Sequence, residues 1–269
     1  MNYDYEKTAG DFLELASQQR LAILSKLLDK KSRVAVIAKE LGATVPEVFR
    51  NFERLLKANL IVKESDGDYS ITTYGKIISS QIPTLEFLSE NKKYFKDHDF
   101  GDLQQKFLQR IGALVTGKHV KGFVKVLEQW KSIYKNSDEY ISNILFEVSY
   151  DTDLLEQLVK KINKGVKVSS IFSESAIIPK DRKQVLEKLG FKKLIEQGLV
   201  QRKMRENVQV VVVLNEKEAG VMFPKVAGEP DVSEMFYSAD PVFHEWCLDY
   251  FKYCWDSSRP FQESKLKHE

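Results

Sequence analysis

The 269-residue sequence predicts a two-domain protein of the α+β or α/β class, in which a small, mainly helical domain with a β-hairpin precedes a larger α/β domain. Apolar residues recur at spacings of three and four through the first 58 residues, which is typical of helices packed on a core. β-branched runs alternate with helical patterns after residue 140, and a polar, turn-rich stretch lies between these regions. We therefore expect domains at residues 1–80 and 103–269, joined by a connecting helix and linker at residues 81–102.

The composition excludes several classes of protein. Apolar residues make up 43% and charged residues 30% of the chain, which is typical of globular proteins and excludes a generally disordered or collagen-like chain. The most apolar run, at residues 210–214, is far below the roughly 20 residues that cross a bilayer, and the first residues lack the pattern of a secretion signal. We expect a cytoplasmic protein with no membrane partner. Cys247 and Cys254 fit buried, reduced thiols better than a disulfide framework or a metal site.

The first domain begins with two expected helices. Residues 8–29 have the apolar spacing of a core-facing helix, with Ser17 as a candidate internal cap. Ser32 is expected to cap a second helix over residues 33–41, and Gly42 suits the left-handed conformation that ends a helix. This pattern predicts a helix, a short turn and then another helix.

A third helix is expected to run to about residue 58, because Thr44 suits its N-cap and Pro46 its first turn. At 100° per residue, its apolar side chains fall on one face, which we expect to be buried. These side chains are Val45, Val48, Phe52, Leu55 and Leu56. The opposite face holds Pro46, Glu47, Arg50, Arg54 and Lys57. The outward face is therefore expected to carry three cations and no large apolar group.

A β-hairpin should follow the third helix. Asn59 suits a left-handed stop, and residues 60–64 and 69–72 have strand character on either side of a turn that contains Gly67. Three helices followed by a two-stranded wing are the elements of a winged helix-turn-helix, in which the third helix enters the major groove and the wing meets the backbone.

Charge in this region favours a nucleic-acid partner. The whole chain has a net charge of only +2, but residues 20–63 hold ten basic and four acidic residues. Arg50 and Arg54 suit bidentate contacts with guanine edges, and flanking cations suit phosphates. The predicted DNA contacts are Lys31, Arg33, Thr44, Pro46, Glu47, Arg50, Arg54, Lys57 and Lys63. Winged helices also serve as protein-docking modules, and the acids Glu47 and Glu53 weaken attraction to phosphate.

The domain resembles prokaryotic ArsR-type winged-helix repressors. The likeness is carried by residues 15–24 (LASQQRLAIL), 37–42 (IAKELG) and 69–76 (YSITTYGK), and it covers about residues 8–80. It implies a winged-helix fold and DNA binding. Metal sensing is not implied, because no cysteine precedes Cys247. Asn59 stands where the family usually has Gly, a substitution that the left-handed conformation tolerates.

The middle of the chain is expected to connect the domains. Residues 76–95 are apolar at helical spacing but interrupted by Pro83, which predicts a bent or broken helix. A helix after the wing would suit homodimerisation, since a dimer reads two half-sites; packing on its own chain is the alternative. Residues 96–102 are polar and turn-rich, so we interpret them as the linker.

The second domain combines helices and strands. The expected helices cover residues 103–115, 123–134, 153–163, 180–189 and 240–255. The expected strands cover residues 140–148, 166–172, 208–214 and 220–224. The first two strands and the helix between them form a β-α-β unit, whereas the last two form a hairpin. Asp240 is the expected N-cap of the final helix, with Pro241 directly after it.

This domain resembles the effector domain of archaeal regulators related to the methanogenesis regulatory protein, whose fold is akin to phospholipase D-like domains. The likeness is carried by residues 107–114 (FLQRIGAL), 215–224 (NEKEAGVMFP) and 243–251 (FHEWCLDYF). Together with the first domain, the resemblance covers nearly the whole chain. It implies a sensing domain without catalytic activity.

Catalytic motifs are weak in this sequence. His119 and Lys121 imitate the start of the phospholipase D motif, but Val126 stands where its acid would fall, and the segment precedes the expected strands. There is no P-loop, dinucleotide fingerprint, nucleophile elbow or zinc quartet. We expect no catalytic residues, no cofactor and no metal site. A small ligand could bind outside the carboxyl ends of the parallel strands, near Ser149, Tyr150, Ser173 and Glu174.

The sequence therefore predicts a homodimeric, sequence-specific transcriptional regulator. Its winged helix would bind double-stranded promoter DNA, and its second domain would respond to a small-molecule or protein effector. The first alternative is a protein-docking adaptor of the transcription machinery. The second is a phospholipase D-like phosphodiesterase.

Overall fold

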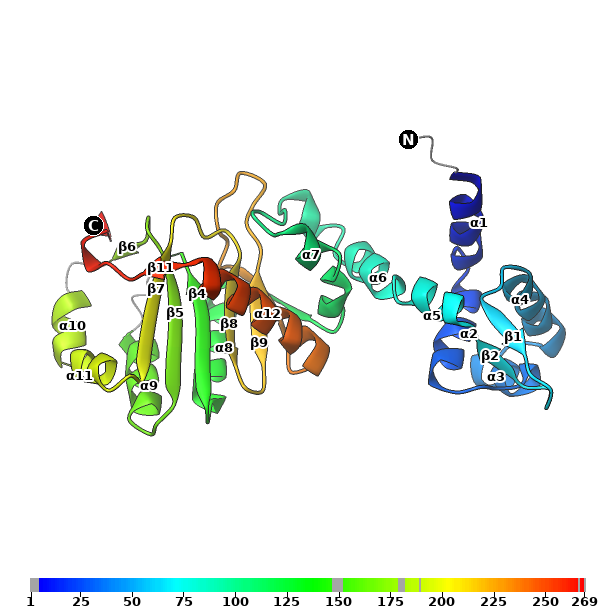
Figure 1. Cartoon of the computed structure of the whole chain (residues 1–269), viewed down its shortest axis with the longest axis horizontal. Coiled ribbons are helices and arrows are strands. Elements are labelled where there is room, and N and C mark those ends of the chain that lie inside the picture. The colour runs from blue at the N-terminus through cyan, green and yellow to red at the C-terminus, as the bar shows by residue number, and fades with distance from the viewer. Residues whose placement is uncertain (1–4, 147–151, 179–181, 189, 266, 269) are drawn as a thin grey trace. The chain divides into compact units, whose positions relative to one another are not determined.

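The computed structural model describes residues 5–146, 152–178, 182–188, 190–265 and 267–268 (Figure 1). The chain forms two compact units that divide between Pro83 and Thr84. Among the described helices, none is both long and apolar enough to span a bilayer.

The first unit holds five helices and one β-hairpin in its described part. The helices are α1 (Tyr5–Leu15), α2 (Gln18–Asp29), α3 (Val34–Leu41), α4 (Val45–Lys57) and α5 (Thr73–Ser79). The hairpin pairs β1 (Ile61–Lys63) with β2 (Tyr69–Ile71) in antiparallel register. The single helix expected over residues 8–29 is therefore wrong. Ser17 has extended backbone and its hydroxyl accepts from the Arg20 amide at 3.4 Å, so a second helix begins there.

Ser32 has a different role from the expected helix cap. Its amide donates to the Tyr69 carbonyl at 3.0 Å and its carbonyl accepts from the Tyr69 amide at 2.9 Å, which adds a short third strand position to the wing. Arg33 is the N-cap of α3, and neither it nor Thr44 makes a side-chain capping bond. Gly42 and Asn59 do adopt the expected left-handed conformation, with φ of 62° and 57°.

The core of the first unit buries one face of α4. Val48, Phe52 and Leu55 are fully buried, as the helical spacing predicts. The ring of Phe52 packs edge-on against Tyr69 of the wing, with centroids 4.7 Å apart. The same prediction is wrong for Val45, which is 49% exposed. The core therefore fixes the rotation of α4 and leaves the opposite face in solvent.

Gly75 allows α5 to lie close to the segment between α4 and β1. The hydroxyl of Thr72 accepts from the Gly75 amide at 2.8 Å and donates to the Asn59 carbonyl at 2.7 Å. A Cβ atom at Gly75 would lie 2.0 Å from the Leu60 carbonyl oxygen. Only glycine fits this contact between α5 and the segment that leads into the wing.

The second unit contains one large sheet with helices on both faces. Its strands are β3 (Lys118–Lys121), β4 (Tyr140–Leu145), β5 (Lys167–Ser173), β6 (Ile177–Ile178), β7 (Val200–Arg205), β8 (Val211–Asn215), β9 (Ala219–Met222), β10 (Glu234–Ser238), β11 (Arg259–Pro260) and β12 (Lys267–His268). Its helices are α6 (Ile82–Glu90), which begins in the first unit, η1 (Tyr94–Lys96), α7 (Gln105–Leu108), η2 (Ile111–Leu114), α8 (Phe123–Asn136), α9 (Thr152–Ile162), α10 (Arg182–Lys188), α11 (Phe191–Glu196), α12 (Pro241–Ser257) and η3 (Glu263–Lys265).

The eight strands of the large sheet run in the order β11-β7-β5-β4-β8-β9-β10-β3. Strands β4, β5 and β7 are parallel, and the remaining neighbours are antiparallel. The expected β-α-β unit and the hairpin of β8 and β9 are confirmed. Helix α12 lies across one face, while α8 and α9 cover the other (Figure 1). Asp240 caps α12 as expected, accepting from the Val242 amide at 2.9 Å.

Residues 84–102, most of the expected connecting helix and linker, belong to the second unit. Phe87 and Tyr94 belong to its hydrophobic core. His98 is buried, and its ring nitrogens bond to the Tyr94 carbonyl at 3.1 Å and the Asp231 carboxylate at 3.0 Å. Residues 97–99 are polar, so the sequence pattern did not predict that His98 is buried. Its partner Asp231 lies 133 residues further along the chain.

The Gly75 contact makes a prediction about stability. Gly75→Ala should lower the free energy of unfolding of the first unit by roughly 1–3 kcal/mol, because the added methyl overlaps a backbone carbonyl. Gly10→Ala in α1, where a Cβ meets nothing within 4 Å, should be neutral or stabilising. Urea unfolding followed by circular dichroism measures both changes. Equal stability of Gly75→Ala and the wild type would contradict the close contact.

Candidate nucleic-acid interface

The outward face of α4 presents the predicted contact residues together. Its exposed residues are Thr44, Pro46, Glu47, Arg50, Arg54 and Lys57. Within the described part of the chain, Arg50 and Lys57 make no ion pair. These two side chains are therefore free to meet a ligand in solvent. This face lies opposite the buried residues of α4, so the packing of those residues in the core turns it toward solvent.

Arg54 is bonded to Glu14, which is not one of the predicted DNA contacts. Its Nε and Nη2 atoms donate to the two carboxylate oxygens of Glu14, at 2.9 and 2.6 Å. Arg20 also contacts this carboxylate at 3.2 Å, while donating to backbone carbonyls at the end of α1. The bond from Arg54 is the largest cause of a lowered pKa at Glu14. Arg54 is thus committed to anchoring α1, which weakens its predicted role in reading guanine.

A polar network joins α2 to α4 behind this face. Gln19 donates to Glu47 at 3.2 Å, and Asn51 donates to Gln19. Arg20 in turn donates to the Asn51 side chain at 3.3 Å. These bonds fix α4 at a constant angle to α2. Sequence periodicity gave no signal for them, because the partners lie about 30 residues apart.

The wing gathers the other three predicted cations. Pairing of Ser32 with β2 brings its neighbours Lys31 and Arg33 beside the turn, where they bond to Asp66 at 2.5 Å and Asp68 at 2.9 Å. Lys63 lies over the ring of Tyr69, 5.8 Å from its centroid. All three cations are exposed. Exposed ion pairs are weak, so a phosphate can take the place of the wing carboxylates.

Two apolar side chains interrupt the solvent surface of α4. Phe49 is 46% exposed and Val45 is 49% exposed. Neither belongs to the residues expected on the outward face, which are Pro46, Glu47, Arg50, Arg54 and Lys57. Val45 was expected on the buried face, and Phe49 directly follows the buried Val48.

Two of the four predicted ligand residues of the second unit lie in the described part of the chain. Ser149 and Tyr150 lie outside the described residues. Ser173 is buried at the end of β5 and bonds to Ser175 at 2.7 Å, whereas Glu174 pairs with Lys265 at 2.9 Å. Ser173 and one carboxylate oxygen of Glu174 thus bond to nearby groups, while Glu174 Oε1 has no hydrogen-bond partner among the described residues.

His119 lies on the edge strand β3, not before the sheet as expected. Its Nε2 atom lies 2.6 Å from a Glu234 carboxylate oxygen, which also lies 3.5 Å from the Lys121 ammonium. The ring stacks on Phe236, and burial is the largest cause of its lowered pKa. A phosphate at this pair would meet the Glu234 carboxylate. No cluster of three or more His, Cys, Asp or Glu side chains in the described residues has the arrangement of a metal site.

Comparisons give no family for this chain. Neither the known family profiles nor the curated proteins contain a match. TrmBL2, an archaeal chromatin protein with a novel mode of DNA binding, has 13% identity and a TM-score of 0.41, covering 95% of this chain and 100% of its own. Nuc, a phospholipase D family member from Salmonella typhimurium, has 13% identity and a TM-score of 0.39, covering 55% and 99%. Similarities this weak leave the function to be argued from the residues themselves.

The Glu14 pair predicts a pH dependence. Because the folded state lowers the pKa of Glu14 from its ordinary value of 4.5, this stabilisation is present above pH 4.5 and is lost as pH falls through the folded value. Glu14→Gln should lower the melting temperature at pH 7, and the difference from wild type should shrink as the pH falls below 4.5. Calorimetry across this range measures it, with Glu53→Gln as the control. A constant difference would contradict the pairing.

Proposed function

We propose that the first unit binds double-stranded promoter DNA with sequence specificity and that the protein is a transcriptional regulator. The observation that carries this proposal is the exposed cationic face of α4, where Arg50 and Lys57 have no ion-pair partner within the described residues. An α-helix fits the major groove, and the polar network with α2 would hold this helix at a defined angle.

In this proposal the two surfaces divide the work. Arg50 donates to a guanine edge, which distinguishes one base pair from another. Lys31, Arg33 and Lys63 on the wing bind phosphates, which adds affinity without sequence preference. Arg54 keeps its bond to Glu14 and positions α1.

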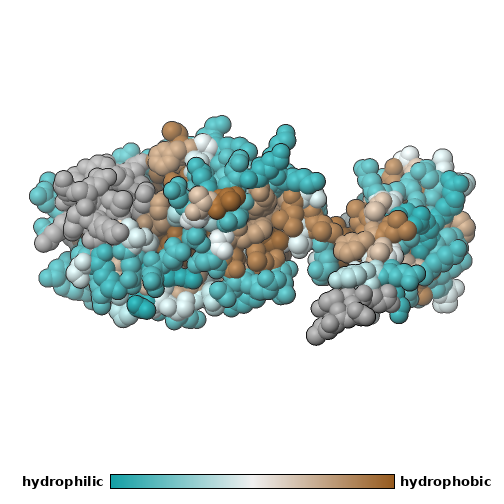
Figure 2. Space-filling model, turned by 90° about the horizontal axis from the view of Figure 1, so that it is seen from above, coloured by the Kyte–Doolittle hydropathy of each residue, from teal (hydrophilic) through white to brown (hydrophobic). Residues whose placement is uncertain are grey.

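We further propose that the regulator is a homodimer. Exposed apolar side chains of the first unit support this, and they occur on α1 and α5. They are Tyr5, Phe12, Leu13, Tyr74 and Ile77. Figure 2 shows hydrophobic atoms among the mainly hydrophilic surface of the first unit. A second copy burying such a surface would carry two recognition helices for two half-sites.

The second unit is proposed to sense an effector without catalysing a reaction. The close approach of Glu234 to His119 and Lys121 argues against phosphodiester chemistry at that pair. An adaptor function has one observation in its favour, namely the exposed Val45 and Phe49 beside the charged face of α4. Binding of a protein partner by α4 would use those apolar groups.

Equilibrium binding over a range of salt tests the DNA-binding function. The purified chain is titrated onto its own upstream promoter fragment and a scrambled duplex of equal length. We expect a clear preference for the promoter and a steep fall in affinity with salt, because bound phosphates release counterions. Weak, salt-insensitive binding without preference would overturn the proposal and favour the adaptor.

Two substitutions separate base reading from phosphate binding. Arg50→Ala should cost roughly 1–3 kcal/mol on the promoter and much less on scrambled DNA. Lys31→Ala should weaken both duplexes similarly and reduce the salt slope by about one. Lys188→Ala, on α10 of the second unit, is the charge-matched control. Equal losses on both duplexes for Arg50→Ala would contradict its base-reading role.

A further inference from the structure

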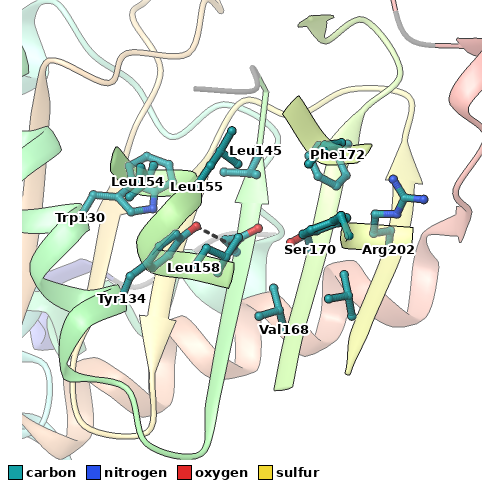
Figure 3. A pocket seen from close by; sticks show the side chains of 14 residues that line it. Trp130, Tyr134, Leu145, Leu154, Leu155, Leu158, Val168, Ser170, Phe172 and Arg202 are labelled. Carbon is teal, nitrogen blue, oxygen red and sulfur yellow. Dashed lines mark hydrogen bonds between the residues drawn. The ribbon is translucent and has the colours of Figure 1, made fainter. Parts of the chain in front are cut away.

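The second unit contains a cavity between its sheet and helices α8 and α9 (Figure 3). Its volume is about 70 Å³, which is room for about two water molecules. The Tyr134 hydroxyl within it accepts from Asn143 Nδ2 at 2.9 Å. The cavity is thus too small for an effector with a hydrocarbon or aromatic body. Residues that act directly on the proposed DNA-binding face lie in the first unit.

Helix α1 is attached to the first unit by polar contacts more than by packing. None of its eleven residues is buried, and Leu15 packs only partly against the core. The Glu14 carboxylate bonds to Arg54 of α4, and Asp11 accepts from the Tyr74 hydroxyl of α5. A helix this short is marginal in isolation. These polar contacts therefore contribute much of what holds α1 in place.

The Glu14 carboxylate lies between two guanidinium groups. Arg54 donates to it through Nε and Nη2 at 2.9 and 2.6 Å, and Arg20 lies 3.2 Å away. Arg20 is 6% exposed and is also fixed by bonds to two carbonyls of α1 and to Asn51. The Arg54 side chain is 47% exposed. If the carboxylate is lost, Arg54 is therefore the arginine that can turn to solvent.

The charges of this cluster sum to +1, because two arginines share one carboxylate. The bond from Arg54 is the largest cause of the lowered pKa of Glu14, so the carboxylate is ionised at neutral pH. Burial lowers the pKa of Arg20, and so does the charge of Arg54, because the two guanidinium groups repel each other. Glu14 offsets this repulsion and neutralises Arg54 where it lies.

The Glu14 pair differs from the ion pairs of the wing. The Glu14 side chain is 14% exposed, whereas that of Asp66, which pairs with Lys31, is 48% exposed. Water and salt weaken exposed pairs, but a partly buried carboxylate that accepts two charge-assisted bonds holds its partner more firmly. DNA phosphates therefore displace Asp66 more readily than Glu14.

We propose that α1 is an autoinhibitory element of the DNA-binding face and that Glu14 is the residue through which it acts. Docked α1 withholds Arg54 from phosphates, so the affinity of α4 for DNA is lower than its cations would otherwise give. Removal or neutralisation of the Glu14 carboxylate frees Arg54 and relieves the inhibition. This inference rests on the proposed function, because the inhibited surface is the proposed DNA-binding face.

The freed Arg54 is expected to bind a phosphate and not a base edge. It lies in the last turn of α4, whereas recognition helices contact bases mainly through their N-terminal residues. A phosphate contact strengthens binding to every duplex and steepens the salt slope by about one. One such contact is worth about three- to fourfold in affinity between 50 and 200 mM salt.

DNA binding of the full chain over this salt range tests the inhibition, with the promoter fragment and the scrambled duplex as probes. Glu14→Gln should bind both duplexes severalfold more tightly at low salt and steepen the salt slope by about one. The double variant Glu14→Gln/Arg54→Gln should lose this gain. Glu53→Gln removes the same charge from α4 and is the matched control, with a smaller gain expected. Unchanged binding in Glu14→Gln, or a gain that persists in the double variant, would overturn the proposal.

A second variant keeps the test decisive if circular dichroism shows that Glu14→Gln unfolds. Because Arg54 is withheld in the wild type, Arg54→Gln alone should leave the salt slope nearly unchanged. Lys31→Gln removes the same charge from an exposed pair and should reduce the slope by about one. A reduction of about one in both variants would overturn the proposal.

Retention on heparin, a polyanion without base sequence, separates failure of this inference from failure of the proposed function. Glu14→Gln should elute at higher salt than the wild type, and Glu14→Gln/Arg54→Gln should not. If these shifts occur while the wild type shows no preference for the promoter, the regulator function fails and the release of Arg54 stands. Equal elution of Glu14→Gln and the wild type would overturn the release of Arg54 even if the promoter is bound specifically.

Discussion

Burial of three side chains of α4 against the hairpin is the constraint on which the first unit depends. Val48, Phe52 and Leu55 occupy the core, and because a helix repeats every 3.6 residues, their burial turns Arg50 and Lys57 to solvent. Tyr69 joins this packing to the wing, since its ring meets Phe52 while its backbone pairs with Ser32. One aromatic contact thus links the position of α4 to that of the wing.

Acidic side chains within the unit decide which cations remain available. Glu14 accepts from Arg54 and Arg20, so Arg54 serves structure first. Asp66 and Asp68 hold the wing cations only at the surface, where ion pairs exchange readily. A ligand rich in phosphates can replace those acids, because it brings more negative charge to the same cations. In the proposed function, base-specific contacts then fall mainly on Arg50.

Local patterns predicted those parts of the fold in which local residues decide the structure. The buried face of α4, the hairpin, the cap at Asp240 and the β-α-β unit follow from spacing and turn chemistry. The sequence analysis did not predict strand β7, because three of its six residues are basic. One of them, Arg205, donates to Asp102 and Cys254, which are distant in the sequence and give no local signal. The charged face of α4 was predictable from local spacing, whereas the bond from Arg54 to Glu14 was not, because these residues are distant in the sequence.

The proposed function places a demand on the polar network behind α4. Gln19, Asn51 and Arg20 join α2 to α4, so the charged face of α4 is held in a fixed position. A ligand changes DNA affinity only by as much as it distinguishes two states of the protein, and a tenfold effect requires about 1.4 kcal/mol of that difference. In the proposed function, an effector of the second unit must therefore favour a state in which this network or the proposed pairing of two copies differs.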